Sequence, residues 1–536
     1  MAGLATSFGS GAMTNSINEI PNTKAMFVIG SNATEAHPVI GTKMKQALAK
    51  GSKLIVVDPR CTDLAEHSDV WLRLRSGTDI ALINGIMNII LANGWEDRAF
   101  IEERTEGFEQ VRELVQKYTP EVVSQITGVP VEQIEEAARL YATAECAEIF
   151  YTLGITEHVC GTDNVMSLAN LAMLTGNLGK ESSGVNPMRG QNNVQGACDM
   201  GALPNVYPGY QQVTNPEAQA KFEAAWGVPL DPNNGFMIPD MFEAAVSKDL
   251  RALYVLGEDP VITDADANHV RKGLKSLDFL IVQEIFLSET AKLADVVLPG
   301  ASYAEKTGTF SNTERRVQMV NQAIKPIGNA KTDGEIICEL ATRMGYPFEY
   351  QSSEEVMQEI AKLTPIFAGI THARLGTQGL QWPVPHAEHL GTKFLHEGKF
   401  NRGKGQFVAI DNQLPAELPD EEYPFLLNTG RKLSHYNVFT QHSPSLEEHS
   451  PEELAEINPE DAKRIRLEEG EVVKVASRRG ELKTKIKITE RVPVGMLYMT
   501  LHYFDSPTNV LTNGAYDKVT KTYEYKVCGV QISKIS

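Results

Sequence analysis

One succession of apolar runs occurs twice in this chain, and it limits the possible folds more than any other feature. In each copy, an apolar run that ends in glycine is followed by a helical stretch and by two further apolar runs. The first copy comprises AMFVIG (25–30), KLIVVD (53–58) and DVWLRL (69–74), and the second comprises ALYVLG (252–257), FLIVQ (279–283) and DVVLP (295–299). Continuous apolar runs of this length are typical of strands buried on both faces of a parallel sheet. With helices expected at 38–50 and at about 265–274, the chain is predicted to be an α/β protein with two related, Rossmann-like (doubly wound) lobes.

The strand ends predict where ligands bind. In doubly wound sheets, ligands lie beyond the carboxyl ends of the strands, where glycine lets a phosphate approach the backbone and a polar residue meets the ribose or base. Two copies of the strand pattern favour two nucleotide-like ligands. Many α/β proteins, however, duplicate such units without keeping both sites, so the pattern alone leaves open whether both copies bind a ligand. The segment GSGAMTN (9–15) is not a dinucleotide fingerprint, because the third glycine is missing and no strand precedes it.

The region between the two copies contains helices and one unusual tract. Residues 103–144 are expected to be helical, with a break at Thr127–Pro130. Residues 154–210 are rich in Gly, Asn and small side chains. Such a run is not expected to fill a core by itself, and a long irregular segment in a compact enzyme is usually functional. We therefore expect this tract to form a wall of the active site.

The C-terminal part changes character after about residue 400, where helices become scarce and short β-type runs alternate with turns. These runs are PFLLNTG, EVVKVASRRGELKTKIKIT, GMLYMT and YKVCGVQIS. They predict a compact C-terminal β-barrel, preceded by a linker within Pro383–Leu418.

Composition restricts the partners. Hydrophobic residues make up 42% and charged residues 22% of the 536 residues, which is ordinary for a globular enzyme of several lobes. The net charge of −19, without a Lys/Arg run, argues against nucleic acid as a partner. The longest apolar stretch, Ile80–Trp95, contains Asn and Gly and is shorter than the roughly 20 residues of a membrane span, so we expect a buried helix. No signal-peptide pattern opens the sequence, and a cytoplasmic location without a membrane span is expected.

The six cysteines lie far apart, and no C-x-x-C pair offers an iron–sulfur or zinc site. They are expected to be reduced and mostly packed, and no metal ligand is expected from this chain. Cys198 follows Arg189 closely, but a small buried thiol is the favoured interpretation.

Longer motifs run from near residue 1 to the C-terminus. They are SFGSGAMTNSINEI, VVDPR, RTEGFE, LAMLTGNLGK, GVNPMRGQNNVQGACDMGALP, YVLGEDP, ADVVLPG, NTERRVQ, KTDGEII and NTGRKLSHY. The fifth of these is highly specific. Together they resemble the large catalytic subunit of molybdenum- or tungsten-dependent formate dehydrogenases, in the family that binds two molybdopterin guanine dinucleotides.

The resemblance implies a division of the chain. Residues 1–190 would form the first guanine-dinucleotide-binding lobe and residues 191–395 the second, with 304–331 expected to pack on an N-terminal domain. Residues 396–536 would hold the linker and a barrel of the double-psi type that binds molybdopterin dinucleotide. On this view, the two copies of the strand pattern serve the two guanine dinucleotides.

The resemblance also implies a substrate residue. Oxidation of formate to CO₂ removes a proton and two electrons from an anion, so the site needs an anion clamp. Arg189 is the expected catalytic residue, because a guanidinium stays charged and can meet a carboxylate bidentately. Its match to the family's substrate-binding arginine favours this role over an ordinary surface charge. His158 is expected either to line the cavity or hydrogen-bond a pterin, or to be a satisfied structural histidine, and these alternatives stay open.

The matched motifs imply a set of cofactor contacts. One dinucleotide would be held by Gly30, Asn32, Glu35, Asp58, Arg60, Gly77 and Asp79, and the other by Gly257, Asp259, Thr263, Gln283 and Asp333. Further contacts are implied for Gly154, Gln191, Arg431, His435, Asn509 and Lys526. Asp58 and Asp333 have the acceptors that the N–H groups of guanine need. Each residue has the alternative of being an ordinary turn or cap residue.

In this family, a selenocysteine or cysteine metal ligand and a His precede an AGL-type segment, which Ala2-Gly3-Leu4 resembles. The metal ligand, that His and the [4Fe–4S] domain are therefore expected to be absent from this chain, which alone is expected to be inactive. We expect an in-frame UGA selenocysteine codon, read as a stop, just upstream of Met1. A two-gene arrangement or a deliberately shortened gene is the alternative.

The expected function is thus formate oxidation, or its reverse, at a molybdenum or tungsten bis-pterin centre. Electrons would pass to an Fe–S protein, ferredoxin, an NAD(P)-linked subunit or a hydrogenase. A nitrate-reductase-like member of the family is an alternative, against which the motif around Arg189 weighs. A naturally short, non-catalytic cofactor-binding subunit is another.

Overall fold

The computed structural model describes residues 1–535, which form two compact units. The first contains residues 1–188, 261–270 and the described residues from 394 onward, and the second contains residues 189–260 and 271–393. The predicted first lobe and the C-terminal barrel thus belong to the same unit. The predicted three-part division of the chain stays a prediction.

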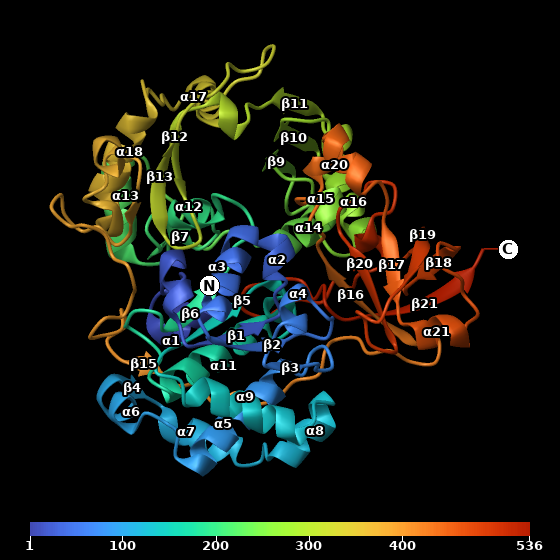
Figure 1. Ribbon diagram of the computed structural model, residues 1–536. Coiled ribbons are helices and arrows are strands. Elements are labelled where there is room, and N and C mark those ends of the chain that lie inside the picture. The colour runs from blue at the N-terminus through green and yellow to red at the C-terminus, as the bar shows by residue number, and fades with distance from the viewer. Residues whose placement is uncertain (536) are drawn as a thin grey trace. The chain divides into compact units, whose positions relative to one another are not determined.

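A five-stranded sheet with the order β3-β2-β1-β5-β6 forms the centre of the first unit (Figure 1). All neighbouring strands are parallel. The strands are β1 (Ala25–Ile29), β2 (Lys53–Val57), β3 (Val70–Leu72), β5 (Ala147–Tyr151) and β6 (Gly184–Pro187). The three strands predicted from the first apolar pattern are confirmed to within two residues.

Both faces of this sheet are buried, as the continuous apolar runs predict. Phe27 and Ile29 of β1 pack into a large apolar core with α5 (Asp79–Asn93), α9 (Val131–Ala142) and α11 (Gly161–Leu174). The alternate residues, Met26 and Val28, pack on the other face against α3 (Pro38–Ala49). The expected buried helix at 80–95 is α5, and the expected break at 127–130 separates α8 (Pro120–Thr127) from α9.

The tract 154–210 differs from expectation in its first half. Residues 161–174 form α11, which is buried along nearly its whole length and contributes Val165, Leu168 and Leu171 to the core. The expectation that this tract does not fill a core is therefore wrong for α11. Small residues let the helix approach its neighbours closely: a Cβ on Gly3 of α1 (Ala2–Phe8) would lie 2.7 Å from the Thr162 carbonyl oxygen.

The second unit contains a three-stranded parallel sheet with the order β11-β10-β9. Its strands are β9 (Ala252–Leu256), β10 (Phe279–Glu284) and β11 (Val296–Pro299), so the second copy of the strand pattern is also confirmed. The unit also contains an antiparallel sheet, with β12 (Gly308–Ser311), β13 (Arg316–Val320) and β14 (Leu380–Gln381). Its longer helices are α13 (Pro216–Trp226), α14 (Ile238–Ser247), α17 (Asp333–Arg343) and α18 (Ser353–Leu363).

The predicted C-terminal barrel is confirmed as a closed six-stranded barrel with the order β16-β20-β17-β19-β18-β21. Its strands are β16 (Phe425–Gly430), β17 (Leu454–Ile457), β18 (Val472–Ala476), β19 (Glu481–Ile488), β20 (Met496–Thr500) and β21 (Cys528–Lys534). Inward-facing side chains such as Leu427, Val475 and Leu497 fill its core. The fold class is thus α/β with two parallel sheets and a barrel.

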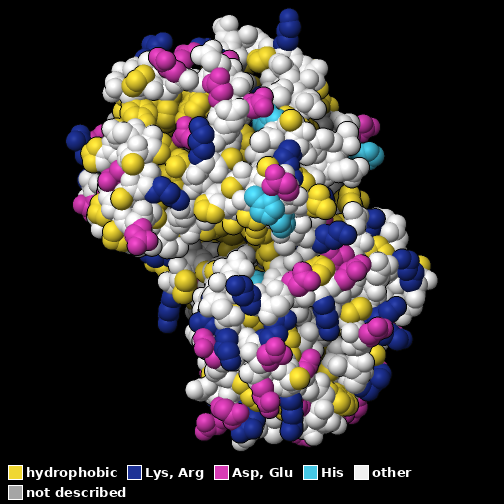
Figure 2. Space-filling view, turned by 90° about the vertical axis from the view of Figure 1, so that its left-hand side faces the viewer, with side chains coloured by type: hydrophobic (Ala, Val, Ile, Leu, Met, Phe, Trp, Pro, Cys, Tyr) yellow, Lys and Arg dark blue, Asp and Glu magenta, His cyan; other side chains and the backbone are white. Residues whose placement is uncertain are grey.

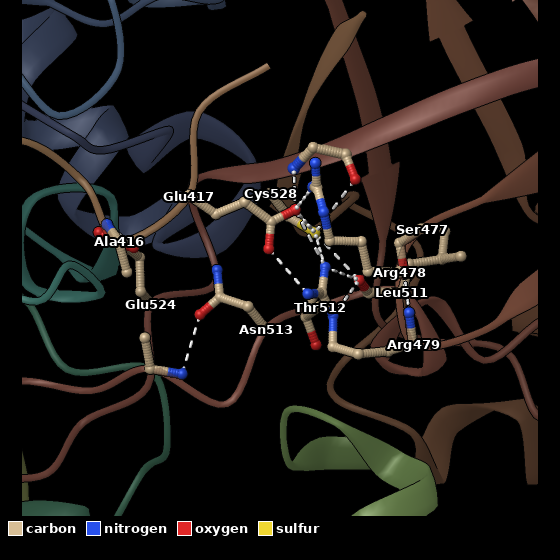
Figure 3. A network of polar contacts seen from close by, with 12 residues as sticks. Ala416, Glu417, Ser477, Arg478, Arg479, Leu511, Thr512, Asn513, Glu524 and Cys528 are labelled. Atoms are coloured by element: carbon tan, nitrogen blue, oxygen red, sulfur yellow. Dashed lines mark hydrogen bonds and ion pairs between the residues drawn. The ribbon is translucent and has the colours of Figure 1, made fainter. Parts of the chain in front are cut away.

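The partly buried carboxylate of Glu417 fastens the linker to the barrel (Figure 3). Glu417 accepts hydrogen bonds from Arg478 (2.9 Å), Arg479 (2.7 Å) and the backbone N–H of Gly529 (2.8 Å). Arg479 also lies 2.8 Å from Sγ of Cys528, and burial raises the pKa of that thiol to about 12. Cys528 is therefore a packed, neutral thiol, as expected for the cysteines, all of which are free.

The surface carries mixed charge. Figure 2 shows acidic and basic side chains interspersed over one face, without a continuous basic area. Within residues 1–535, no helix has both the length and the apolar character that crossing a bilayer requires.

Candidate functional site

The carboxyl end of β1 brings Gly30 and Gly154 together in the first unit. Gly30 has φ of 54°, in the left-handed region, and its carbonyl accepts hydrogen bonds from the Gly154 N–H (3.1 Å) and the Thr152 hydroxyl (2.7 Å). A Cβ on Gly30 would lie 2.5 Å from the backbone nitrogen of Ile155. Only glycine fits here, and the two predicted glycines lie on adjoining backbones.

Two buried donors follow Gly30. The Ser31 hydroxyl and the Asn32 side-chain nitrogen are buried and have no hydrogen-bond partner among residues 1–535. Glu35, also a predicted contact, lies 3.5 Å from Arg491. Buried donors without a partner are rare in proteins, and at the carboxyl end of a parallel strand they fit an anionic ligand such as a diphosphate.

The end of β2 brings Asp58 and Arg60 together. Asp58 accepts a hydrogen bond from the Arg60 N–H (2.9 Å). Burial raises the pKa of Asp58 to about 6, against the lowering effects of Arg60 and Lys526, and the charge of Asp79 adds to the rise. The Arg60 guanidinium donates to Glu456 of the barrel at 2.9 and 3.1 Å and lies over the Tyr498 ring. Arg60 thereby joins β2 to the barrel.

Gly77 and Asp79 lie beyond β3. Gly77 has φ of 82°, and a Cβ there would overlap the ring of Pro415 in the linker. Asp79 is the buried first residue of α5, and burial raises the pKa of its carboxyl. The linker therefore packs on the predicted cofactor loop.

His158 and Lys526 occupy one buried group of charges with Asp79. Lys526 Nζ pairs with Glu157 at 2.7 Å and donates to the Thr429 carbonyl at 2.9 Å. His158 Nδ1 lies 3.7 Å from Glu524, and its Nε2 lies 3.1 Å from the Gly154 carbonyl oxygen. Burial works to lower the pKa of His158, but Glu524 and Asp79 raise it more. Nε2 therefore has a hydrogen-bond acceptor, whereas Nδ1 faces the Glu524 carboxylate beyond hydrogen-bond distance and has no hydrogen-bond partner among residues 1–535.

The barrel places Asn509 beside Thr263. The Asn509 side chain donates to the Thr263 carbonyl (2.8 Å) and the Ile262 carbonyl (2.9 Å), so these two predicted residues are brought together. Arg431 follows β16, and its carbonyl accepts from the Tyr498 hydroxyl. His435 uses Nδ1 with Thr440 (3.1 Å) and Nε2 with the Ser450 carbonyl (2.7 Å). His435 therefore orders its own loop.

The second unit brings Gly257, Gln283 and Asp333 together. The Gly257 N–H donates to the Gln283 carbonyl (2.9 Å), and the Gln283 side chain donates to Asp333 (2.7 Å), which also pairs with Lys306. Gly257 has φ of 65°, and no atom of the described residues lies within 4 Å of a Cβ built on it. By contrast, the Asp259 carboxylate accepts from the Thr290 N–H (2.9 Å) and hydroxyl (2.6 Å), so it is engaged by a distant loop of the same unit.

Arg189 stands at the start of the second unit, directly after β6 in the chain. Its N–H donates to the Thr313 hydroxyl (3.1 Å), and its Nη1 lies 3.6 Å from Sγ of Cys198. Its Nε is buried and has no partner among the described residues. Gln191, two residues on, is exposed. Arg189 therefore keeps a free donor, while its backbone is fixed.

Sequence reasoning missed several buried polar residues. In the barrel these include Glu456 and His502, and the half-buried Lys432 was missed as well. Burial lowers the pKa of His502 to about 3, so its ring is neutral. Near Arg189 they include Asp199, at the end of α12 (Val194–Asp199). Asp199 could have been found from the sequence, because it lies inside the specific motif GVNPMRGQNNVQGACDMGALP.

Comparison with known proteins identifies the family. Residues 3–343 match the molybdopterin oxidoreductase family, and residues 425–529 match the molybdopterin dinucleotide binding domain. The chain is 49% identical over 541 residues to the F420-dependent formate dehydrogenase subunit alpha of Methanocaldococcus jannaschii, covering 100% of this chain and 80% of that protein. It is 43% identical over 545 residues to formate dehydrogenase H of Escherichia coli, covering 100% and 76%.

A solved structure has the same fold. Acetylene hydratase from Pelobacter acetylenicus superposes with a TM-score of 0.79 at 23% identity, over 100% of this chain and 80% of that chain. These comparisons are consistent with the architecture described above, which has two parallel sheets whose first strands end in glycine, and a closed barrel. This chain belongs to the molybdopterin oxidoreductases, together with the alpha subunits of formate dehydrogenases.

Proposed function

We propose that this chain is a formate dehydrogenase alpha subunit that oxidises formate to CO₂, or catalyses the reverse reaction, with Arg189 as the residue that binds formate. The observation that carries the proposal is the buried Nε of Arg189, which has no partner within residues 1–535. The Arg189 backbone N–H donates to the Thr313 hydroxyl at 3.1 Å, and Nη1 lies 3.6 Å from the Cys198 sulfur, so both the backbone and the guanidinium have a contact while Nε keeps a free donor.

A charged guanidinium with free donors suits a small carboxylate. Formate offers two oxygens that can take parallel N–H···O bonds, and such charge-assisted pairs are stronger than neutral hydrogen bonds. Gly190 follows Arg189 directly, so no side chain blocks the approach on that side. The relatives, which are formate dehydrogenases, support the same assignment.

The residues at the strand ends fit a pterin dinucleotide in each half of the chain. Gly30, Ser31 and Asn32 offer a close backbone and two buried donors for one diphosphate, with Asp58 and Asp79 nearby. Gly257, Gln283 and Asp333 offer an open backbone position and an amide–carboxylate pair for the second. When bound, the molybdenum or tungsten pterin group supplies the acceptor for the two electrons of formate.

Formate oxidation also needs a route for electrons. We propose an electron-transfer subunit or a soluble carrier as the partner, and a [4Fe–4S] cluster held outside this chain. Support for a carrier comes from a relative that is described as F420-dependent, and the cluster is expected from the family resemblance alone. The identity of the metal, the identity of the acceptor and the cytoplasmic location stay predictions.

Substrate choice tests the function directly. The holoenzyme, isolated without oxygen from a host that supplies the cofactor, is assayed with formate and a viologen dye, and separately with nitrate and reduced viologen. The proposal expects formate-dependent dye reduction and no nitrate-dependent oxidation. Activity with nitrate alone would overturn the proposal in favour of the nitrate-reductase-like alternative.

A further inference from the structure

A buried carboxylate lies in the immediate surroundings of Arg189, on an element that Arg189 itself contacts. Asp199 is the last residue of α12 and is completely buried. The residue before it, Cys198, lies 3.6 Å from Arg189 Nη1 through its sulfur. Asp199 and Arg189 are thus connected through one short helix.

Three neutral donors hold the Asp199 carboxylate. Oδ1 accepts from the Gln195 side chain and from the Tyr210 hydroxyl, both at 2.7 Å, and Oδ2 accepts from the Trp382 indole at 2.7 Å. Tyr210 has φ of 62°, a left-handed conformation that a bulky residue seldom adopts. Strain of this kind persists only where the surrounding structure fixes it, and here it brings the tyrosine hydroxyl to the carboxylate.

The charge of Asp199 is not neutralised by an ion pair. In the described part of the chain, the side chains that donate to its carboxylate are Gln195, Tyr210 and Trp382, and none of them is a cation. Burial raises the pKa of Asp199 to about 6, while its three hydrogen bonds and the positive charge of Arg189 oppose the rise. Near neutral pH the group is therefore an anion, and Arg189 is the cation that acts on it.

We propose that Asp199 is a positioning residue that sets how strongly Arg189 attracts formate. The inference rests on the proposed role of Arg189. Because three donors fix the carboxylate, it does not turn to pair with the guanidinium and so leaves the Arg189 N–H groups available. Its negative charge nevertheless offsets part of the positive potential at the substrate position. Formate is an anion and CO₂ is neutral, so the charge of Asp199 weakens the binding of formate and not that of CO₂.

The test compares a charge change with a matched change that keeps the charge. Asp199→Asn removes the anion with little change in shape, and Tyr210→Phe removes one donor but keeps the carboxylate. Both variants are measured as holoenzymes at pH 8, with KM for formate, KM for CO₂, and the calorimetric dissociation constant of azide, a small monoanion. Asp199→Asn is expected to lower the formate KM and the azide dissociation constant by about tenfold, which is the order of effect that one unit charge has on an anion across a partly screened site. The CO₂ KM is expected to stay unchanged.

Tyr210→Phe is expected to change all three constants by less than about twofold at pH 8, since the carboxylate keeps its charge. A purely structural role for Asp199 would instead alter kcat and thermal stability in both variants without separating formate from CO₂. Equal changes in the two KM values, or an unchanged azide constant in Asp199→Asn, would overturn the inference.

If Asp199→Asn does not fold, azide binding by Tyr210→Phe at two pH values tests the same proposal. The groups around Asp199 are Arg189, Cys198 and Tyr210, with the neutral side chains of Gln195 and Trp382. Loss of the Tyr210 donor raises the pKa of Asp199 further, so Tyr210→Phe is expected to bind azide more tightly than wild type at pH 6 but not at pH 8. The same azide constants in both proteins at both pH values would contradict the proposal.

Arg189→Gln separates this inference from the function on which it rests. If Arg189→Gln leaves the formate KM unchanged, the role of Arg189 itself fails. If Arg189→Gln raises the formate KM while Asp199→Asn does not lower it, only the inference about Asp199 fails.

Discussion

The buried carboxyl group of Glu148 is expected to make the stability of the first unit depend on pH. This residue of β5 is completely buried, and its Oε1 accepts a hydrogen bond from Asn186 of β6 at 3.1 Å. Its Oε2 is buried without a partner among residues 1–535. Burial raises the pKa of Glu148 to about 8, and the charge of Glu19 adds to the rise. At neutral pH the group is therefore protonated in the folded protein.

The sign and the size of the effect follow from linkage. The pKa rises from 4.5 to about 8 on folding, a difference of about 3.5 pH units. At about 1.4 kcal/mol per unit, this corresponds to roughly 4–5 kcal/mol as an upper limit. Because the folded-state pKa is the higher one, the stabilisation is fully present below pH 4.5 and is lost as the pH rises through about 8.

Glu148→Gln tests this reasoning. The amide mimics the protonated carboxyl group, and its oxygen can still accept from Asn186. We expect the free energy of unfolding of the first unit, measured by urea titration, to fall by several kcal/mol less between pH 5.5 and pH 8.5 in the variant than in the wild type. Glu135→Gln, at an exposed position of α9, is the matched control and should keep the wild-type slope. The same slope in Glu148→Gln and the wild type would refute the reasoning.

Three further predictions concern contacts that hold the sites together. Glu456→Gln leaves the buried Arg60 without its counter-charge and should destabilise the first unit by about 3–5 kcal/mol in urea unfolding; an effect below about 1 kcal/mol would contradict a buried pair. Glu417→Ala removes the acceptor that fastens the linker, so it should lower the free energy of unfolding by about 2–3 kcal/mol and expose residues 394–418 to limited proteolysis. Cleavage at the wild-type rate would contradict the role of Glu417 in fastening the linker. Asp333→Asn should lower the calorimetric affinity for a guanine nucleotide about tenfold, with Asp249→Asn, at an exposed position, as a control that should keep the affinity; equal affinities in Asp333→Asn and wild type would count against the second dinucleotide site.

The strands could be predicted from sequence because their burial is local information. AMFVIG and ALYVLG are apolar at every position, since both faces of a parallel strand are covered, and the glycine marks the strand end. The helix at 161–174 was missed because its small residues are typical of loops as well as of closely packed helices. Its burial depends on neighbours such as α5 and α1, which sequence periodicity does not reveal.

The site was predictable only where a motif carried it. Arg189 lies in a motif that matches the family, and Gly30 and Gln283 end two of the apolar runs. The structure places Gln283 beside Asp333, 50 residues away in the chain. The hydrogen bonds to Asp199, near Arg189, could not be predicted from the sequence, because Trp382 and Asp199 lie 183 residues apart in the chain. Contacts over such distances depend on tertiary packing and leave no local pattern.

The central claim is that Arg189 binds formate, and steady-state kinetics of Arg189→Lys and Arg189→Gln test it most directly. Lysine keeps the charge but not the fork of donors, and glutamine keeps neither. We expect the formate KM of the holoenzyme to rise about tenfold in Arg189→Lys and on the order of a hundredfold in Arg189→Gln, in line with the loss of a charge-assisted, bidentate contact. A formate KM unchanged in both variants would contradict the account.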